Sequence, residues 1–286
     1  MSERTGIDAL IHKIGGDKRL DRVAATVSDA VGAVAKPTVV KNALSGSWLG
    51  HQLHPVLTDL PIGAWGAATV LDLTAGEEGA KAARRLVGFG ILSAVPTAMS
   101  GASDWADTVG RNKRVGLVHG LANAAGTGLQ AASWFARRRG HRGVGVVLSL
   151  LALSTTLASA YLGGHLSFVR GVGVNRTAFQ HPTRTWTDVA ADADITEGAL
   201  ARVTADGVPV LLARRGEELR AISAVCSHAG GPLDEGTLDQ DGCVTCPWHG
   251  SRFRTQDGSV VRGPASVPQP QWEVRVDGGR IFVRSA

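Results

Sequence analysis

Residues 226–233 read CSHAGGPL, and residues 246–253 read CPWHGSRF. Each stretch holds one cysteine and one histidine at short spacing, Cys226 with His228 and Cys246 with His249. Thiolates and imidazoles are metal ligands, so each stretch supplies one ligand of each kind from a single loop. Two such loops suit a [2Fe–2S] centre in which histidines replace cysteines on one of the two irons.

Zinc is the competing interpretation, because it also binds cysteine and histidine. The usual zinc signatures keep the cysteines together and the histidines together. Here the order alternates Cys226, His228, Cys246, His249, with 17 residues between the second and third. The alternation favours the two-iron centre, with the thiolates on one iron and the neutral imidazoles on the other.

The two motifs and a third stretch, GPASVP at residues 263–268, together resemble a Rieske domain. The resemblance covers about the last hundred residues. It implies an all-β fold in which the third stretch forms a proline-rich loop over the cluster, so that Pro264 contacts the cofactor. A Rieske domain moves single electrons.

The resemblance also indicates a branch of the family. Rieske proteins of quinol-oxidising cytochrome complexes carry two extra cysteines, and those positions here are Gly231 and Trp248. The chain is more similar to the ferredoxin and oxygenase branch. Ser251 stands where a hydroxyl can hydrogen-bond a cluster sulfur, and Phe253 stands where the high-potential branch has a tyrosine. Fewer donors to the sulfurs predict a reduction potential toward the lower end of the Rieske range.

Residues 186–286 have the texture of a small all-β domain, with short apolar runs between Gly, Asp and Pro turns. The clearest prediction is a hairpin of residues 272–276 and 280–284 around Asp277-Gly278-Gly279. Cys243, the third cysteine, lies outside the motif, and we expect it to be a buried thiol in a strand.

Four segments in the first half could each cross a bilayer, which needs about 20 mostly apolar residues. They are residues 53–73, 86–103, 115–136 and 144–164. The last three contain no charged residue, whereas the first contains Asp59 and Asp72. These segments predict an all-α four-helix transmembrane bundle.

The expected organisation is an amphipathic segment at residues 1–50, a membrane domain at 51–168, a linker at 169–185 and the Rieske domain at 186–286. Within the first segment, apolar residues at three- and four-residue spacing predict a helix over residues 18–35. Pro37 then ends it.

If the four helices alternate in direction, most of their polar residues come to one face of the membrane. The residues concerned are His51, His54, Asp59, Asp104, His119 and His165. Ionisable residues at membrane depth are costly and often functional. The histidines could ligate a b-type haem, relay protons to or from a quinone, or hydrogen-bond one another. The segments around them also resemble an uncharacterised bacterial four-helix membrane family, sometimes fused to a Rieske domain, with no established activity.

The net charge of +5 comes with no basic stripe interleaved with aromatic residues, which argues against nucleic-acid binding. We expect a membrane-anchored electron carrier, an oxidoreductase component without its own substrate domain. Its partners would be the lipid bilayer and a redox protein or quinone. Two alternatives stay open, a redox-sensing or interaction module and the electron-supplying component of an oxygenase acting in trans.

Lysines and arginines are similar in number at the two ends of the predicted helices, so the positive-inside rule does not decide the orientation. The amino terminus has no signal-peptide pattern, and the extra cysteine pair is missing. Both observations favour a multi-pass cell-membrane protein with its Rieske domain in the cytoplasm.

Overall fold

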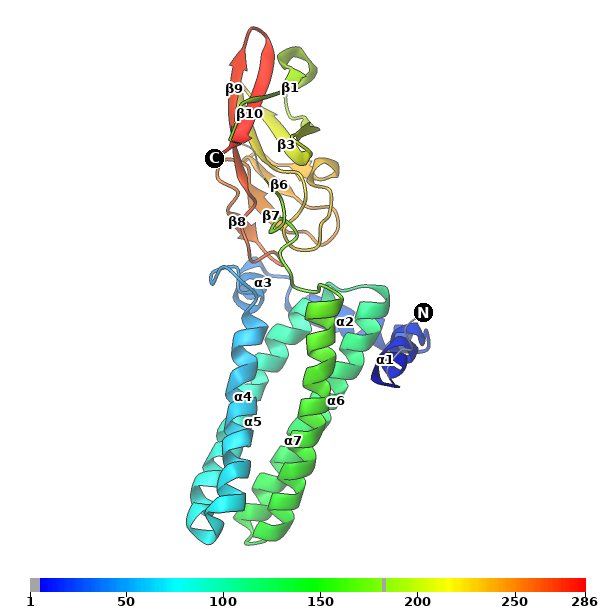
Figure 1. Ribbon diagram of the computed structural model, residues 1–286, viewed down its shortest axis with the longest axis vertical. Helices are drawn as coiled ribbons and strands as arrows, with labels where there is room; N and C mark the ends of the chain where they lie inside the picture. Colours follow the sequence, from blue (N-terminus) through cyan, green and yellow to red (C-terminus); the bar gives the residue numbers. More distant parts are fainter. Residues whose placement is uncertain (1–5, 182–183) are drawn as a thin grey trace. The chain divides into compact units, whose positions relative to one another are not determined.

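The computed structural model describes residues 6–181 and 184–286 (Figure 1). Residues 1–5 and 182–183, parts of the predicted amino-terminal segment and linker, lie outside the described residues. The chain divides into two compact units, one helical and one of β-structure. The helical unit ends its first part at Lys36 and resumes over Leu53–Val172, and the β unit comprises Pro37–Gln52 and Gly173–Ala286. The predicted fold class, a helical first part followed by an all-β domain, is confirmed.

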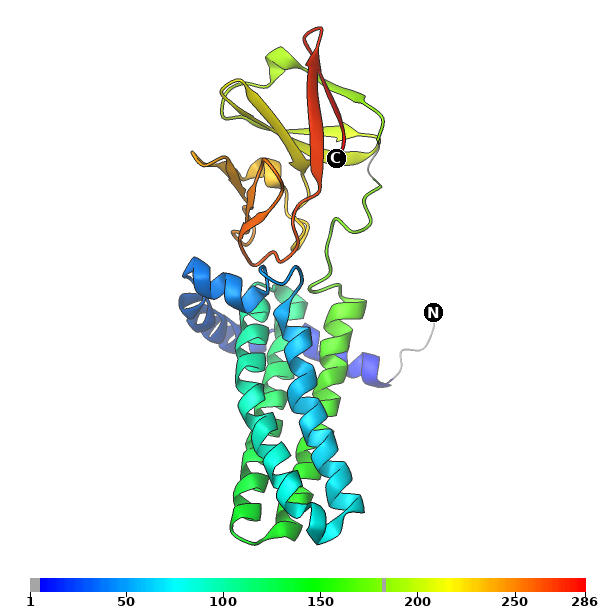
Figure 2. The same cartoon turned by 90° about the vertical axis from the view of Figure 1, so that its left-hand side faces the viewer.

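The helical unit begins with two short helices, α1 (Gly6–Gly16) and α2 (Leu20–Val34). Four longer helices follow and run side by side in both views (Figures 1 and 2). These are α4 (Leu53–Thr74), α5 (Gly76–Ala106), α6 (Gly110–Arg138) and α7 (Arg142–Gly164), the last continued by the π-helix η1 (His165–Val169). Helix α5 begins ten residues before the predicted apolar segment, because Glu77 and Glu78 suit a helix N-terminus and the alanines and arginines after them are good helix formers.

Three of these helices are long and apolar enough to cross a membrane: α4, α5, and α7 together with η1. Helix α6 does not reach that hydropathy, since polar residues such as Asn123 and Gln130 interrupt its apolar surface. Helix α2 and the following α3 (Thr38–Ser45), bent by 113° at a short break, pass the test only as one broken span. The described residues therefore hold three candidate spans, or four with the bent pair, and the predicted count of four spans is not confirmed.

The hairpin α4–α5 and the hairpin α6–α7 make the same contacts. In the first, Nδ1 of His54 lies 3.0 Å from the carbonyl oxygen of Thr97. In the second, Nδ1 of His119 lies 2.7 Å from the carbonyl oxygen of Ser159. In both hairpins, a histidine of the first helix hydrogen-bonds the backbone near the end of the second helix.

The correspondence continues eleven residues further along the first helix of each hairpin. Nε1 of Trp65 donates to the carbonyl of Val87 at 3.4 Å, and Nε2 of Gln130 donates to the carbonyl of Ser149 at 3.5 Å. Val87 and Ser149 each lie ten residues before the backbone partner of the histidine. Helices α6 and α7 therefore repeat α4 and α5, and the bundle has an internal pseudo-two-fold symmetry.

The β unit contains two antiparallel sheets. The larger has strand order β1-β10-β9-β4-β3-β2 and the smaller β5-β6-β7-β8. The strands of the larger are β1 (Thr187–Ala191), β2 (Leu200–Ala205), β3 (Val208–Arg215), β4 (Glu218–Ser223), β9 (Gln271–Asp277) and β10 (Arg280–Ser285). Those of the smaller are β5 (Thr237–Leu238), β6 (Cys243–Thr245), β7 (Arg252–Arg254) and β8 (Val260–Arg262).

Two predictions about this unit are confirmed. The terminal hairpin is formed by β9 and β10, and both turn residues, Gly278 and Gly279, have positive φ angles of 56° and 76° that glycine adopts without strain. Cys243 is buried at the start of β6.

Helix α3 belongs to the β unit, although it precedes the helical bundle in the sequence. Nδ2 of Asn42 donates to the carbonyl of Val261 at 3.1 Å, and its Oδ1 accepts the N–H of Gly263 at 2.8 Å. One side chain thus satisfies two backbone groups at the end of β8, immediately before Pro264. Helix α3 thereby fixes the start of the loop that the sequence places over the cofactor.

Candidate metal centre

The first motif forms a tight loop after β4. The N–H of Gly230 donates to the carbonyl of Cys226 at 2.9 Å, and the N–H of Cys226 donates to the carbonyl of Gly231 at 2.9 Å. Gly230 has a φ of 83°, a left-handed conformation that favours glycine. The loop therefore returns on itself and projects His228 from its tip.

The second motif repeats this loop between β6 and β7. The N–H of Gly250 donates to the carbonyl of Cys246 at 3.1 Å, and the N–H of Cys246 donates to the carbonyl of Ser251 at 2.8 Å. Gly250 has a φ of 71°. The two motifs thus share one backbone design, which explains why glycine follows each cysteine by four residues.

The side chains pair by chemical type in space, although they alternate in the sequence. The thiols of Cys226 and Cys246 hydrogen-bond each other, and both residues are almost fully buried. The rings of His228 and His249 have centroids 5.1 Å apart with an interplanar angle of 87°. The structure therefore brings together all four predicted ligands, as a sulfur pair and a nitrogen pair.

Backbone amides surround the two sulfurs. In each loop, the N–H groups two and three residues after the cysteine hydrogen-bond its sulfur. The hydrogen bond from Cys226 lowers the pKa of Cys246 to about 6, whereas the hydrogen bond with Cys246 and burial raise the pKa of Cys226. Amide donors stabilise thiolates, the form in which cysteine binds metal. The donors are His228, Ala229, Trp248 and His249.

Nδ1 of His228 is buried and has no hydrogen-bond partner. Burial, followed by the charges of His249, Lys41 and Arg176, lowers the pKa of His228 to about 3. The imidazole is therefore neutral, as metal ligation requires. An unpaired buried nitrogen is costly unless something binds it, and a metal beside the sulfur pair would supply that partner.

The arrangement fits two metal ions better than one. Among residues 6–181 and 184–286, no group of three or more His, Cys, Asp or Glu side chains converges on a single-ion site. A tetrahedral zinc site would require such convergence of all four ligands. Two pairs, one of sulfur and one of nitrogen, match a cluster with a different ligand pair on each iron.

Comparison with known proteins agrees with this geometry. Residues 185–273 match the Rieske [2Fe-2S] domain family. Ferredoxin CarAc of Metapseudomonas resinovorans is 35% identical over 99 residues, which cover 92% of that protein and 34% of this chain. The chain belongs to the Rieske [2Fe–2S] family. Membership implies a [2Fe–2S] cluster in the β unit.

Other relatives of the Rieske domain are similar in kind. The 3-phenylpropionate/cinnamic acid dioxygenase ferredoxin subunit of Escherichia coli K12 is 38% identical over 92 residues, covering 85% of that protein and 32% of this chain. Among solved structures, the ferredoxin of carbazole 1,9a-dioxygenase from Nocardioides aromaticivorans IC177 is 32% identical. The match covers 36% of this chain and 99% of that chain, with a TM-score of 0.35.

The helical unit has a separate match. Residues 50–176 match a family described as "Predicted membrane protein (DUF2231)". The predicted combination of a Rieske domain with an uncharacterised membrane family is therefore confirmed. With the apolar helices, this match suggests a membrane location.

The proline-rich loop of the Rieske domain is latched to both motif loops. Oγ of Ser251 accepts the N–H of Ala265 at 3.0 Å, and the hydroxyl of Ser227 donates to the carbonyl of Val267 at 2.7 Å. Pro264 follows a cis peptide bond and is fully buried. Because the oxygen of Ser251 serves as the acceptor, its own O–H is available to donate to a cluster sulfur.

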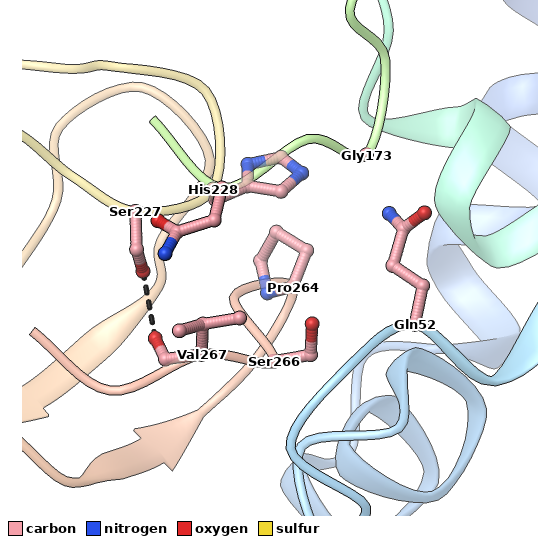
Figure 3. A pocket seen from close by; sticks show the side chains of 8 residues that line it. Gln52, Gly173, Ser227, His228, Pro264, Ser266 and Val267 are labelled. Carbon is pink, nitrogen blue, oxygen red and sulfur yellow. Dashed lines mark hydrogen bonds between the residues drawn. The ribbon is translucent and has the colours of Figure 1, made fainter. Parts of the chain in front are cut away.

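A small pocket lies beside His228 within the β unit. In Figure 3, the rings of His228 and Pro264 lie on one side and the amide of Gln52 faces them from the other. Gln52 and Gly173 come from the two segments where the chain enters and leaves the helical unit. The lining residues are Gln52, Gly173, Asn175, Ser227, His228, Pro264, Ser266 and Val267.

The branch-determining positions are adjacent in the structure. A Cβ atom added to Gly231 would lie 2.9 Å from Sγ of Cys246 and 3.0 Å from the ring of Trp248. Glycine is therefore required beside this tryptophan, and the pair fills the space next to Cys246. Phe253 is fully buried and has no hydroxyl to offer.

The candidate residues of the helical unit are only partly brought together. His54 and His119 lie with ring centroids 6.4 Å apart. Asp59 is exposed on α4, Asp104 lies in the last turn of α5, and His165 begins η1. The structure therefore selects one histidine pair from the predicted set.

Sequence reasoning missed the residues that surround the candidate centre. Lys41 and Asn42 of α3, together with Gln52 and Arg176, belong to segments outside the predicted Rieske domain. No local pattern marks them, because their role depends on contacts between segments more than 120 residues apart.

Proposed function

We propose that Cys226, His228, Cys246 and His249 hold a [2Fe–2S] cluster and that the protein is a one-electron carrier anchored in a membrane by its helical unit. The observation that supports the cluster assignment best is the pairing of the ligands, sulfur with sulfur and imidazole with imidazole, from two loops of one design. The match to a membrane family and the apolar helices support the anchor.

The bound cluster would accept and release single electrons. The chain's own residues prepare the site for it. Backbone amides hold the two cysteines as thiolates, and burial keeps His228 neutral. Ser251 and Pro264 complete the pocket, the first as a hydroxyl donor to a sulfur and the second as a cover that excludes water.

We place the potential toward the lower end of the Rieske range. Phe253 offers no hydroxyl, and Gly231 and Trp248 stand where another branch has a disulfide, so Ser251 is the side-chain donor that remains at these positions. The electron partner would be a redox protein or a quinone. The similarity to ferredoxins named as parts of dioxygenases favours an oxygenase component acting in trans as the first partner to test. The Rieske domain would face the cytoplasm.

The chain offers a matched control for the ligand assignment. Cys226→Ser and Cys246→Ser should each abolish the visible absorption and the reduced-state EPR signal of the full-length protein purified in detergent. Cys243→Ser, a change at an equally buried cysteine outside the motif, should keep both. A cluster signal that survives Cys226→Ser, or zinc in place of iron in the wild type, would refute the assignment.

A second experiment addresses electron carriage. In isolated membranes, NADH or quinol should reduce the cluster within the time of one turnover, with reoxidation by an added acceptor. A cluster that is intact but changes state only over many minutes would indicate a sensor and contradict the carrier.

A further inference from the structure

Two histidines meet in the core of the helical unit. His54 comes from α4 and His119 from α6, the equivalent helices of the two repeated hairpins. Their rings have centroids 6.4 Å apart and an interplanar angle of 87°. The pair therefore lies at the pseudo-two-fold axis, where one hairpin faces its copy.

Each histidine is held in one protonation form by its hairpin partner. Nδ1 of His54 faces the carbonyl of Thr97, and Nδ1 of His119 faces the carbonyl of Ser159. A carbonyl only accepts hydrogen bonds, so both rings carry their proton on Nδ1. Each Nε2 is then left with a lone pair. A backbone carbonyl that fixes the tautomer in this way is the usual support of a metal-binding histidine.

Glycines make room for both rings at equivalent positions. A Cβ atom on Gly101 would lie 2.6 Å from the His54 ring, and one on Gly163 would lie 3.0 Å from the His119 ring. Each glycine follows the backbone partner of its histidine by four residues. The repeat therefore preserves the histidine, its carbonyl anchor and the space beside it, although few residues match between the hairpins elsewhere.

The ring separation fits two imidazoles on opposite sides of one metal. An imidazole nitrogen binds a transition metal at about 2 Å, and the ring centre lies about 1 Å further, so two such rings have centres roughly 6 Å apart. A bare ion at this point would be under-coordinated, because no group of three or more His, Cys, Asp or Glu converges in the described part of the chain. A haem supplies four nitrogens of its own and needs only two axial ligands from the protein.

We propose that His54 and His119 are the axial ligands of a haem bound between the two hairpins of the helical unit. Side chains on facing helices are a common means of holding such cofactors in bundles. Nδ2 of Asn123 lies 3.2 Å from Nε2 of His119, and ligation replaces this hydrogen bond with the bond to iron. An oxidised quinone fits the pair less well, because its oxygens and both Nε2 atoms are all acceptors.

The test uses the full-length protein purified in detergent from cells supplied with a haem precursor. We expect a Soret band and the EPR spectrum of a six-coordinate low-spin haem, with close to one haem per chain. His54→Ala and His119→Ala should each lower the haem content at least tenfold. His165→Ala and His51→Ala should keep it, as should Cys226→Ser, which removes the proposed iron–sulfur ligand and leaves this site intact.

Alanine variants could fail to fold, so His119→Met provides a second reading. Methionine also ligates haem, and we expect bound haem with a shifted EPR spectrum. Haem-free protein with an intact cluster signal would overturn the proposal while leaving the electron carrier standing. Wild-type haem content and spectra in both alanine variants, or an unchanged EPR spectrum in the methionine variant, would also overturn it.

Discussion

Asp72 and Arg137 occupy equivalent positions in the two hairpins of the helical unit, each 18 residues after a histidine of the central pair. Their side chains form a buried ion pair, with Nη2 of Arg137 2.5 Å from Oδ2 of Asp72 and Nη1 2.8 Å from Oδ1. Both side chains are at most 3% exposed. The pseudo-two-fold axis thus joins two identical residues at one level of the bundle and two opposite charges at another.

Removing one member of this ion pair should destabilise the helical unit. Asp72→Ala leaves a buried guanidinium without its main partner, and breaking a buried pair in this way costs about 3–5 kcal/mol. Thermal unfolding in detergent should show a clearly lower midpoint. The swapped double variant Asp72→Arg with Arg137→Asp should recover part of the loss, because the two positions are equivalent. A midpoint unchanged in Asp72→Ala would contradict this reading of the repeat.

Two cations should raise the potential of the proposed cluster. Lys41 and Arg176 act on His228 through their charge, and positive charge stabilises the reduced cluster, which carries one more electron. Lys41→Gln and Arg176→Gln should each lower the midpoint potential by roughly 30–70 mV, as expected for one charge at intermediate distance and dielectric. EPR-monitored redox titration measures it. Arg280→Gln, at the start of β10, is the control and should change little.

The hydroxyl of Ser251 should have a comparable effect. Ser251→Ala removes the proposed donor to a cluster sulfur, and the loss of one hydrogen bond that favours the reduced state corresponds to about 50–100 mV of lower potential. The same redox titration provides the measurement. Ser259→Ala, a change at a serine outside the motif loops, should leave the potential as in the wild type. Equal potentials in the two variants would exclude a role for Ser251 as a sulfur donor.

Helix α3 should prolong the life of the cluster. Asn42→Ala removes two hydrogen bonds to the backbone on either side of Arg262, each worth about 1 kcal/mol. The loop that carries Pro264 would be less firmly held, so cluster absorption should bleach severalfold faster in air or on mild heating. Asn112→Ala, in the helical unit, controls for a general effect of losing an asparagine. Identical bleaching rates for wild type and Asn42→Ala would show that α3 does not hold this loop.

The sequence was informative where the signal was local. Short spacing tied Cys226 to His228 and Cys246 to His249, and the resulting loops place these side chains within reach of one another. The terminal hairpin and helix α2 followed from turn residues and apolar periodicity in the same way.

Other features could not be read from short segments. The predicted third span contains no charge, yet α6 carries amides such as Gln130 that hydrogen-bond inside the bundle, so its hydropathy is lower than an uncharged run suggested. The internal repeat is carried by contacts more than by identical residues, since Trp65 and Gln130 perform the same task with different chemistry. Lys41 and Arg176 approach His228 only because distant segments meet in the fold.

The β unit is built from two stretches of chain, Pro37–Gln52 and Gly173–Ala286, with the helical unit inserted between them. A soluble fragment cut from the carboxy-terminal side alone would therefore be an incomplete protein, lacking the charge of Lys41 and the two backbone anchors of Asn42. Electrochemistry on such a fragment would describe a different electron carrier from the native one. Joining residues 37–52 to residue 173 through a short artificial connection would be the more faithful way to study this unit without lipid.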